Sequence, residues 1–159
     1  MEELGEKHRI PVTDILNYYI EYTTAAYREA TVGYGHYDGF LDDSVLKGYA
    51  AAAGEDEILG FGTLEKYKRI STFSDTADVM YFIKPGYTGR GIGRKLLSRL
   101  EAEARELGIK KLVADISDDN RDSLEFHRNN GFREYGRLAG CWNKKGVSLG
   151  IVFMEKDLS

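Results

Sequence analysis

Apolar residues in the segment 92–107 recur at intervals of three and four positions, which is the spacing of one face of an α-helix. Gly108 follows this segment directly and is a typical stop signal for a helix. A later helix is expected to begin where Asp119 or Asn120 can cap its first turn, and to end at Gly131.

A first helix is expected near the N-terminus, with Thr13 or Asp14 as its N-cap. Its apolar side would be formed by Ile15, Leu16, Tyr19 and Ile20. A polar, glycine-containing stretch over residues 33–43 separates this helix from residues 44–49, which we expect to be helical or irregular.

Short apolar runs predict the strands. Residues 49–53 and 58–64 flank a turn signal at Gly54-Glu-Asp56 and predict a hairpin. Further strands are expected at residues 76–83, 112–116, 132–137 and 149–156. Because a helix precedes the strand at 112–116, that strand should lie nearly parallel to the one at 76–83. This order predicts an α/β layered fold with a mixed sheet.

Length and composition fit one domain, which we expect to span residues 1–159. Hydrophobic residues make up 42% of the chain, enough for a full core. The net charge of −4 argues against a nucleic-acid partner, since such proteins usually present a basic face. The chain has no apolar run of bilayer length and a charged N-terminus, so we expect no membrane association. A single cysteine, Cys141, fits a reducing cytoplasm.

The sequence offers little for metal or serine-nucleophile chemistry. His8, His36 and His127 are far apart, and no Cys, His or carboxylate cluster has metal-ligand spacing, so we predict no metal. There is also no G-x-S-x-G motif.

The run Gly86-Tyr-Thr-Gly-Arg-Gly-Ile-Gly-Arg-Lys95 joins a predicted strand to a predicted helix. Backbone N–H groups at such a helix start, together with the positive end of the helix dipole, bind phosphate groups. Arg90, Arg94 and Lys95 add positive charge. The loop therefore predicts a phosphate or pyrophosphate ligand, and the alternative is a glycine-rich turn without a ligand.

Two common phosphate loops do not fit this run. The G-x-G-x-x-G fingerprint needs a third glycine where Arg94 stands, and a P-loop needs Lys and Ser or Thr after its last glycine. The remaining pattern, Thr88-Gly-Arg-Gly-Ile-Gly93, resembles the pyrophosphate loop Q/R-x-x-G-x-G/A of the GNAT superfamily of acetyl-CoA-dependent N-acetyltransferases. Thr88 stands where Gln or Arg is usual.

A second motif strengthens this resemblance. The segment from Asn120 through Ser123 and His127 to Gly131-Phe132 is similar to the family pattern N-x-x-[SA]-x-x-x-[YH]-x-x-x-G-F. Membership implies a single-domain GNAT fold, with a mixed, mostly antiparallel twisted sheet flanked by helices, and acetyl-CoA as co-substrate.

Nearly the whole chain resembles one branch, the phosphinothricin and methionine sulfoximine N-acetyltransferases. The resemblance rests on the opening segment with Asn17, Glu21, Thr24, Tyr27 and Arg28, and on a histidine at position 127. The chain departs from that branch at residues 148–150, where Ser-Leu-Gly replaces a Trp-x-Asp element.

The resemblance also implies how acetyl-CoA is held. The pantetheine arm would bind the backbone of the strand end, at Tyr81, Phe82 and Ile83. The pyrophosphate would bind the loop amides of Gly89, Arg90, Gly91, Ile92, Gly93 and Arg94. Asn120 would hydrogen-bond the pantetheine arm, and the alternative for this residue is simple helix capping.

Two residues are candidates for catalysis. Asp78 falls where the branch has a catalytic Glu, so it would take a proton from the amine; the alternative is a solvent-facing strand residue or one paired with Lys68. His127 would donate a proton or a hydrogen bond to the leaving thiolate; the alternative is a histidine that orients its helix against the sheet. Tyr27, Tyr67 and Trp142 are candidate substrate-pocket aromatics, although packing explains any tyrosine equally well.

We therefore expect an N-acetyltransferase that moves acetyl from acetyl-CoA to a primary amine by direct attack in a ternary complex. The expected acceptor is a small molecule, an amino acid or an analogue. The alternatives are a protein or peptide N-acetyltransferase and a non-catalytic acyl-CoA-binding regulatory domain. The resemblance also implies a possible homodimer, to which the tyrosine-rich stretch 18–37 would contribute.

Overall fold

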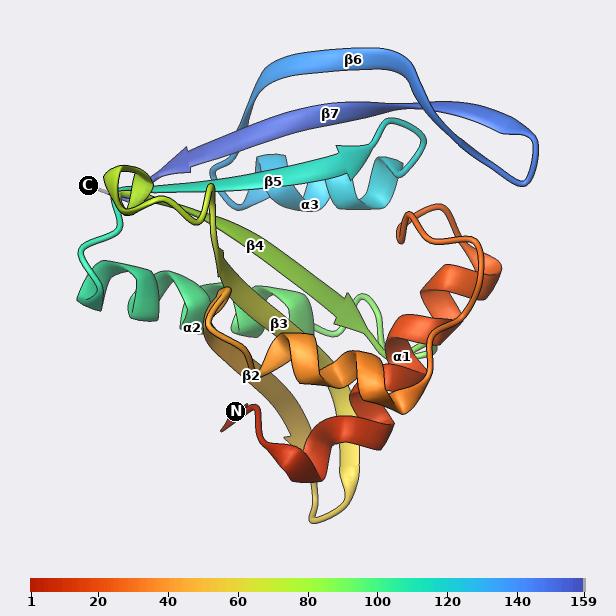
Figure 1. Ribbon diagram of the computed structural model, residues 1–159, viewed down its shortest axis with the longest axis vertical. Helices are drawn as coiled ribbons and strands as arrows, with labels where there is room; N and C mark the ends of the chain where they lie inside the picture. Colours follow the sequence, from red (N-terminus) through yellow and green to blue (C-terminus); the bar gives the residue numbers. More distant parts are fainter. Residues whose placement is uncertain (159) are drawn as a thin grey trace.

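The computed structural model describes residues 1–158, which form one seven-stranded sheet with helices on both faces (Figure 1). The strands are β1 (Glu2–Glu3), β2 (Val45–Ala53), β3 (Glu57–Lys66), β4 (Thr76–Ile83), β5 (Lys111–Ser117), β6 (Arg133–Lys144) and β7 (Val147–Asp157). The α-helices are α1 (Arg9–Tyr22), α2 (Ile92–Glu106) and α3 (Arg121–Asn129), and short 3-10 helices are η1 (Glu6–His8), η2 (Tyr34–Phe40) and η3 (Ser71–Phe73). None of the helices within residues 1–158 is long and apolar enough to cross a membrane.

The strands lie in the order β1-β2-β3-β4-β5-β7-β6. Within residues 1–158 every pair of neighbours is antiparallel except β4 and β5, which are parallel. Helix α2 connects these two strands, because parallel neighbours need a crossover connection. The expectations of a mixed, mostly antiparallel sheet and of a parallel strand after the second helix are confirmed.

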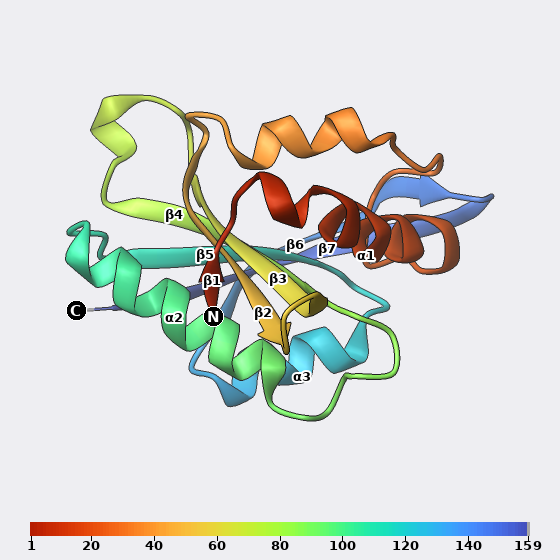
Figure 2. The same ribbon diagram turned by 90° about the horizontal axis from the view of Figure 1, so that it is seen from below.

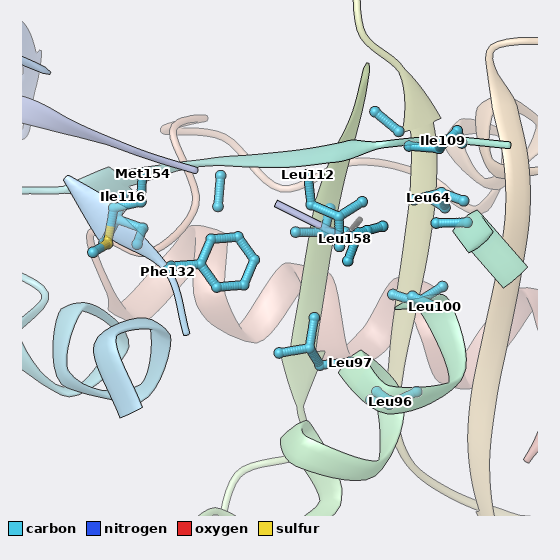
Figure 3. Close-up of a cluster of buried hydrophobic side chains, with 14 of the residues drawn as sticks. Leu64, Leu96, Leu97, Leu100, Ile109, Leu112, Ile116, Phe132, Met154 and Leu158 are labelled. Carbon is cyan, nitrogen blue, oxygen red and sulfur yellow. The ribbon is translucent and has the colours of Figure 1, made fainter. Parts of the chain in front are cut away.

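Different helices cover the two faces of the sheet. Figure 2 shows α2 and α3 on one side and α1 on the other, and we call these the α2 face and the α1 face. On the α2 face, Leu97 and Leu100 are almost fully buried against the strands that carry Leu64 and Leu112 (Figure 3). Burying a leucine side chain contributes about 1.5–3 kcal/mol to stability, so this layer fixes α2 and the loop that precedes it.

The α1 face has a second apolar cluster. Val12 and Ile20 of α1 pack there with Tyr37 of η2 and Phe61 of β3. The stretch at 33–43 is therefore more than a polar spacer, because its residue Tyr37 is fully buried in this cluster. This cluster holds the C-terminal end of α1 against the sheet.

Helix α1 begins earlier than predicted. The expected caps Thr13 and Asp14 lie inside the helix, which starts at Arg9. The Thr13 hydroxyl instead donates a hydrogen bond to the carbonyl of Arg9, 2.6 Å away. Pro11 is tolerated because it stands in the first turn, where backbone N–H groups have no partner within the helix.

The expectation of a helical or irregular segment at residues 44–49 is wrong. Strand β2 already begins at Val45, and Gly48 pairs with Thr63 of β3. A glycine weakens a strand pattern in the sequence. The position is crowded here, because a Cβ atom at Gly48 would lie 2.7 Å from Cδ1 of Leu4 and that side chain would have to move.

The last hairpin is longer than the sequence indicates. β6 continues from Arg133 to Lys144, beyond the expected end at residue 137, and β7 begins at Val147. The pairing of β6 with β7 shifts register between Leu138 and Trp142. Such an irregularity hides the alternation of apolar and polar residues on which the prediction depended.

Replacing Leu100 with Ala should lower the free energy of unfolding by about 2–5 kcal/mol, because its side chain is fully buried and leaves a cavity. Urea denaturation measures this loss. Leu107→Ala is the matched control at the exposed end of the same helix, where the loss should stay within about 0.5 kcal/mol. Equal losses in the two variants would contradict the packing described for α2.

Candidate active site

Strands β4 and β5 separate before either of them ends. They pair from Thr76 and Lys111 to Asp78 and Val113, yet β4 continues to Ile83 and β5 to Ser117 (Figure 1). No strand within residues 1–158 pairs with this side of β4 beyond Asp78. A cavity of about 890 Å³ lies in this fork, and the start of α2, the helix α3 and residues 23–25 complete its walls.

The glycine loop forms one end of the cavity. Gly89 and Gly91 have φ angles of +74° and +82°, a left-handed conformation that favours glycine. Gly91 is the N-cap of α2, and no side chain within the described residues caps this helix start. Its first backbone N–H groups therefore remain available to a ligand. Gly89, Gly91, Ile92, Gly93 and Arg94 line the cavity, whereas the Arg90 guanidinium lies over the Tyr87 ring, 4.9 Å from its centroid.

The end of β4 forms a long wall of the same cavity. Tyr81, Phe82 and Ile83 all line it, as the sequence predicted for the residues that hold a cofactor arm. The Tyr19 hydroxyl of α1 donates a hydrogen bond to the carbonyl of Ile83. Backbone polar groups at this edge need partners, and a ligand bound in the fork would supply them.

Asn120 caps α3 and also lines the cavity. Its side-chain oxygen accepts a hydrogen bond from the Ser123 backbone N–H at 3.2 Å, so it caps α3. The residue also lines the cavity, which leaves its amide N–H₂ group next to the fork.

His127 is buried and forms a pair with Tyr81. Its Nδ1 lies 2.7 Å from the carbonyl of Ser123, which can only accept, so Nδ1 carries the hydrogen. Nε2 is then the acceptor, and the Tyr81 hydroxyl donates to it. Burial lowers the pKa of His127 to about 4, which keeps the ring neutral near pH 7. This geometry favours a histidine that orients α3 against β4.

Asp78 stands where the two strands part. Its side chain points to the α1 face with Met80 and Phe82, because Ala77, Val79 and Tyr81 face α2. Asp78 and His127 therefore lie on opposite faces of the sheet, and the structure does not bring these two candidates together. The cavity wall begins at Val79, directly beside Asp78.

The surroundings of Asp78 suit a base. Burial, together with the negative charges of Asp115 and Glu65, raises its pKa to about 7, and Lys68 opposes this rise. The ion pair with Lys68 considered from the sequence is not formed among residues 1–158. A carboxyl group with a pKa near neutrality can both accept and release a proton at that pH.

Neither of the two candidate substrate tyrosines is among the residues that line the cavity. The Tyr27 hydroxyl donates to the backbone carbonyl of Asp115 at 3.3 Å, and its ring meets the Trp142 ring edge-on at 4.9 Å. The Tyr67 ring packs against Phe73 with 6.1 Å between centroids. Tyr27 thus contacts a residue that lines the cavity, and the two tyrosine hydroxyl groups do not converge on one hydrogen-bond partner among the described residues.

One wall of the cavity was missed by the sequence analysis. Thr23 and Thr24 follow α1, and the buried Lys144 fixes them by donating from Nζ to the carbonyls of Thr23 and Ala26, both at 2.7 Å. Thr24 also donates to Asp119 at 2.7 Å. These partners are about a hundred positions apart in the chain, so no local pattern indicates the contact.

Within residues 1–158 there is no group of three or more His, Cys, Asp or Glu side chains that could hold a metal ion.

Comparison with known proteins relates this arrangement to characterised enzymes. A family model described as the acetyltransferase (GNAT) family matches residues 12–132. The chain is 30% identical to the L-amino acid N-acyltransferase MnaT of Escherichia coli K12. It is 29% identical to the L-methionine sulfoximine/L-methionine sulfone acetyltransferase of Salmonella typhimurium LT2. Each match covers 92% of this chain and 87% of the relative.

Two solved structures superpose closely on this chain. One is described as a ribosomal-protein-alanine N-acetyltransferase from Brucella melitensis, with a TM-score of 0.90, 28% identity and 98% of both chains covered. The other is yncA from Salmonella typhimurium with its cofactor acetyl-CoA, with a TM-score of 0.89, 25% identity and coverage of 99% of this chain and 92% of that one. The expected family and its branch are confirmed.

The ring of His127 should stay neutral from about pH 5 to about pH 8, because burial disfavours its charged form. Nitrogen-detected NMR of the histidine rings measures this, and His127→Gln assigns the signal. The Nε2 shift should move in Tyr81→Phe, which removes the hydrogen-bond donor. A titration midpoint near the ordinary value of about 6.5 would contradict the described pairing.

Proposed function

The chain belongs to the GNAT family of acetyltransferases, and on this premise we propose that it transfers acetyl from acetyl-CoA to the primary amine of an amino acid or an amino acid analogue. The observation that carries the proposal is the fork. It joins an unpaired strand edge, an open helix start and a partly buried carboxyl group in one place. The names of the relatives support an acceptor of this class.

The residues of the fork fit acetyl-CoA. The backbone of Tyr81, Phe82 and Ile83 would hold the pantetheine arm in the manner of an added strand, with Asn120 on the opposite wall. The amides of residues 89–94 would bind the pyrophosphate, favoured by the helix dipole and by Arg94. A structure of an acetyltransferase with acetyl-CoA, superposing on nearly the whole chain, supports this placement.

Asp78 would prepare the amine. Amines are mostly protonated near neutral pH, and the carboxylate of Asp78 would take a proton from the ammonium group, directly or through water. The neutral nitrogen would then attack the thioester carbonyl, so that the N–C bond forms and the C–S bond breaks. As the thiolate of CoA leaves, it takes up a proton that balances the one lost by the attacking nitrogen in becoming an amide, and Asp78 releases its own proton to solvent. A backbone N–H of β4 would stabilise the oxyanion of the tetrahedral intermediate.

We assign His127 a positioning role. Its single ring hydrogen is engaged by Ser123, and its free lone pair accepts the Tyr81 hydroxyl hydrogen. In this state it has no proton to give to the thiolate at neutral pH. The pair instead joins α3 to β4 and keeps both walls of the fork in place.

A protein N-terminus is the second candidate acceptor. It is supported by the similarity to the structure described as a ribosomal-protein-alanine N-acetyltransferase. The rate with free amino acids compared with short alanine peptides separates the two. A purely regulatory acyl-CoA-binding role is disfavoured, because such a role gives no reason for a carboxyl group with a raised pKa beside the fork.

We also propose that the protein forms a homodimer and acts in the cytoplasm. Tyr18, Tyr22 and Tyr34 are exposed on or near α1, where a second copy would cover them. Tyr37, in the same stretch, is buried within its own chain and is not available for such an interface. Cys141 is exposed and free, as is usual in a reducing compartment.

Replacing Asp78 with Asn should lower kcat by about 10²–10⁴-fold, the usual contribution of a general base. The affinity for acetyl-CoA should change by less than about twofold, because Asp78 is not among the residues that line the cofactor cavity. Thiol release measures kcat and calorimetry measures the affinity. Asp75→Asn removes an exposed carboxylate three residues away and should behave like the wild type.

The pH profile tests the same assignment. The wild-type rate should rise through about pH 7, because Asp78 acts only after it has lost its proton. If Asp78→Asn keeps its turnover or this limb of the profile, Asp78 is not the base.

A further inference from the structure

Asp115 faces Asp78 across the fork. On β5, Ala114 and Ile116 belong to the cluster on the α2 face, so Asp115 between them points to the α1 face. Asp115 lines the cavity, and its charge is one cause of the raised pKa of Asp78. The two carboxyl groups therefore stand on the two separating strands, on the side of the sheet from which an acceptor would approach Asp78.

This part of the site carries an uncompensated negative charge. No ion pair to Asp78 or Asp115 forms among residues 1–158. Arg94 is the one Lys or Arg among the described residues that line the cavity, and it stands at the glycine loop, away from Asp115. Lys68 influences Asp78, but its ammonium group lies over the Tyr67 ring, 5.1 Å from the centroid.

Aromatic side chains border the same negative region. The Tyr27 hydroxyl contacts the backbone of Asp115, and Trp142 packs against the Tyr27 ring. The Tyr135 ring lies against the Phe153 ring, 6.0 Å between centroids, and Phe153 is the β7 neighbour of Asp115. Aromatic faces and carboxylates together attract ammonium groups.

We propose that Asp115 is a specificity-determining residue that favours acceptors with a second positive charge in addition to the reacting amine. This inference rests on the proposed function and narrows its acceptor class. As the reacting nitrogen approaches Asp78, the second ammonium group of the acceptor lies against Asp115 and the neighbouring aromatic rings. An uncharged chain of the same length in that position leaves the Asp115 charge without a partner.

Matched acceptor pairs test this inference by thiol release at saturating acetyl-CoA. The pairs are 1,4-diaminobutane with butylamine, and lysine with norleucine, which differ in the second ammonium group. The wild type should prefer the doubly charged member in kcat/KM by about tenfold or more. In Asp115→Asn, which keeps size and polarity, this ratio should fall to about threefold or less.

Asp118→Asn serves as the matched control, because Asp118 is an exposed carboxylate just beyond the end of β5. It should keep the wild-type ratio. Similar rates for both members of each pair in the wild type, or an unchanged preference in Asp115→Asn, would overturn the role of Asp115 while leaving the proposed function standing. Absence of thiol release with every amine, with acetyl-CoA still bound by calorimetry, would overturn the proposed function and this inference with it.

Discussion

Two parallel strands that stop hydrogen bonding partway along their length leave backbone groups without partners, and such groups need to be satisfied. β4 and β5 part after Asp78 and Val113, and the unpaired edge of β4 becomes a wall of the cavity. Tyr19 of α1 satisfies Ile83, the last residue of this strand. The rest of the edge lies open to the cavity, and the leucine layer of α2 sets the glycine loop at the end of that edge.

The sheet also divides the chemistry between its faces. On the α2 face, the pair of His127 and Tyr81 is neutral and buried, and it holds the walls of the fork. On the α1 face, Asp78 is half-buried and Asp115 is exposed, and the charge of Asp115 helps to raise the pKa of Asp78. A thioester placed in the fork would have the His127–Tyr81 pair on the α2 face and the proposed base, Asp78, on the α1 face.

Much of this arrangement is predictable from local patterns. Three features depend only on residues close together in the sequence, so they can be predicted from it: the leucine period of residues 92–107, the glycines at 89–93 and the motif from Asn120 to Phe132. Contacts between segments far apart in the sequence could not be predicted from such local patterns. Gly48 is a strand residue because it pairs with Thr63, fifteen positions away, and Lys144 anchors Thr23 from the far end of the chain. The position of Asp78 relative to Asp115 likewise depends on where β4 and β5 separate, which no short motif encodes.

The central claim is that the fork binds acetyl-CoA through the glycine loop and the edge of β4. Calorimetric titration of acetyl-CoA into the wild type and into Gly91→Val tests it most directly, with ATP as a control ligand. We expect saturable binding that ATP does not reproduce, and a loss of at least about tenfold in affinity in Gly91→Val, since a β-branched residue resists the φ angle of +82° at that position. No binding by the wild type, or equal binding by both proteins, would contradict the account.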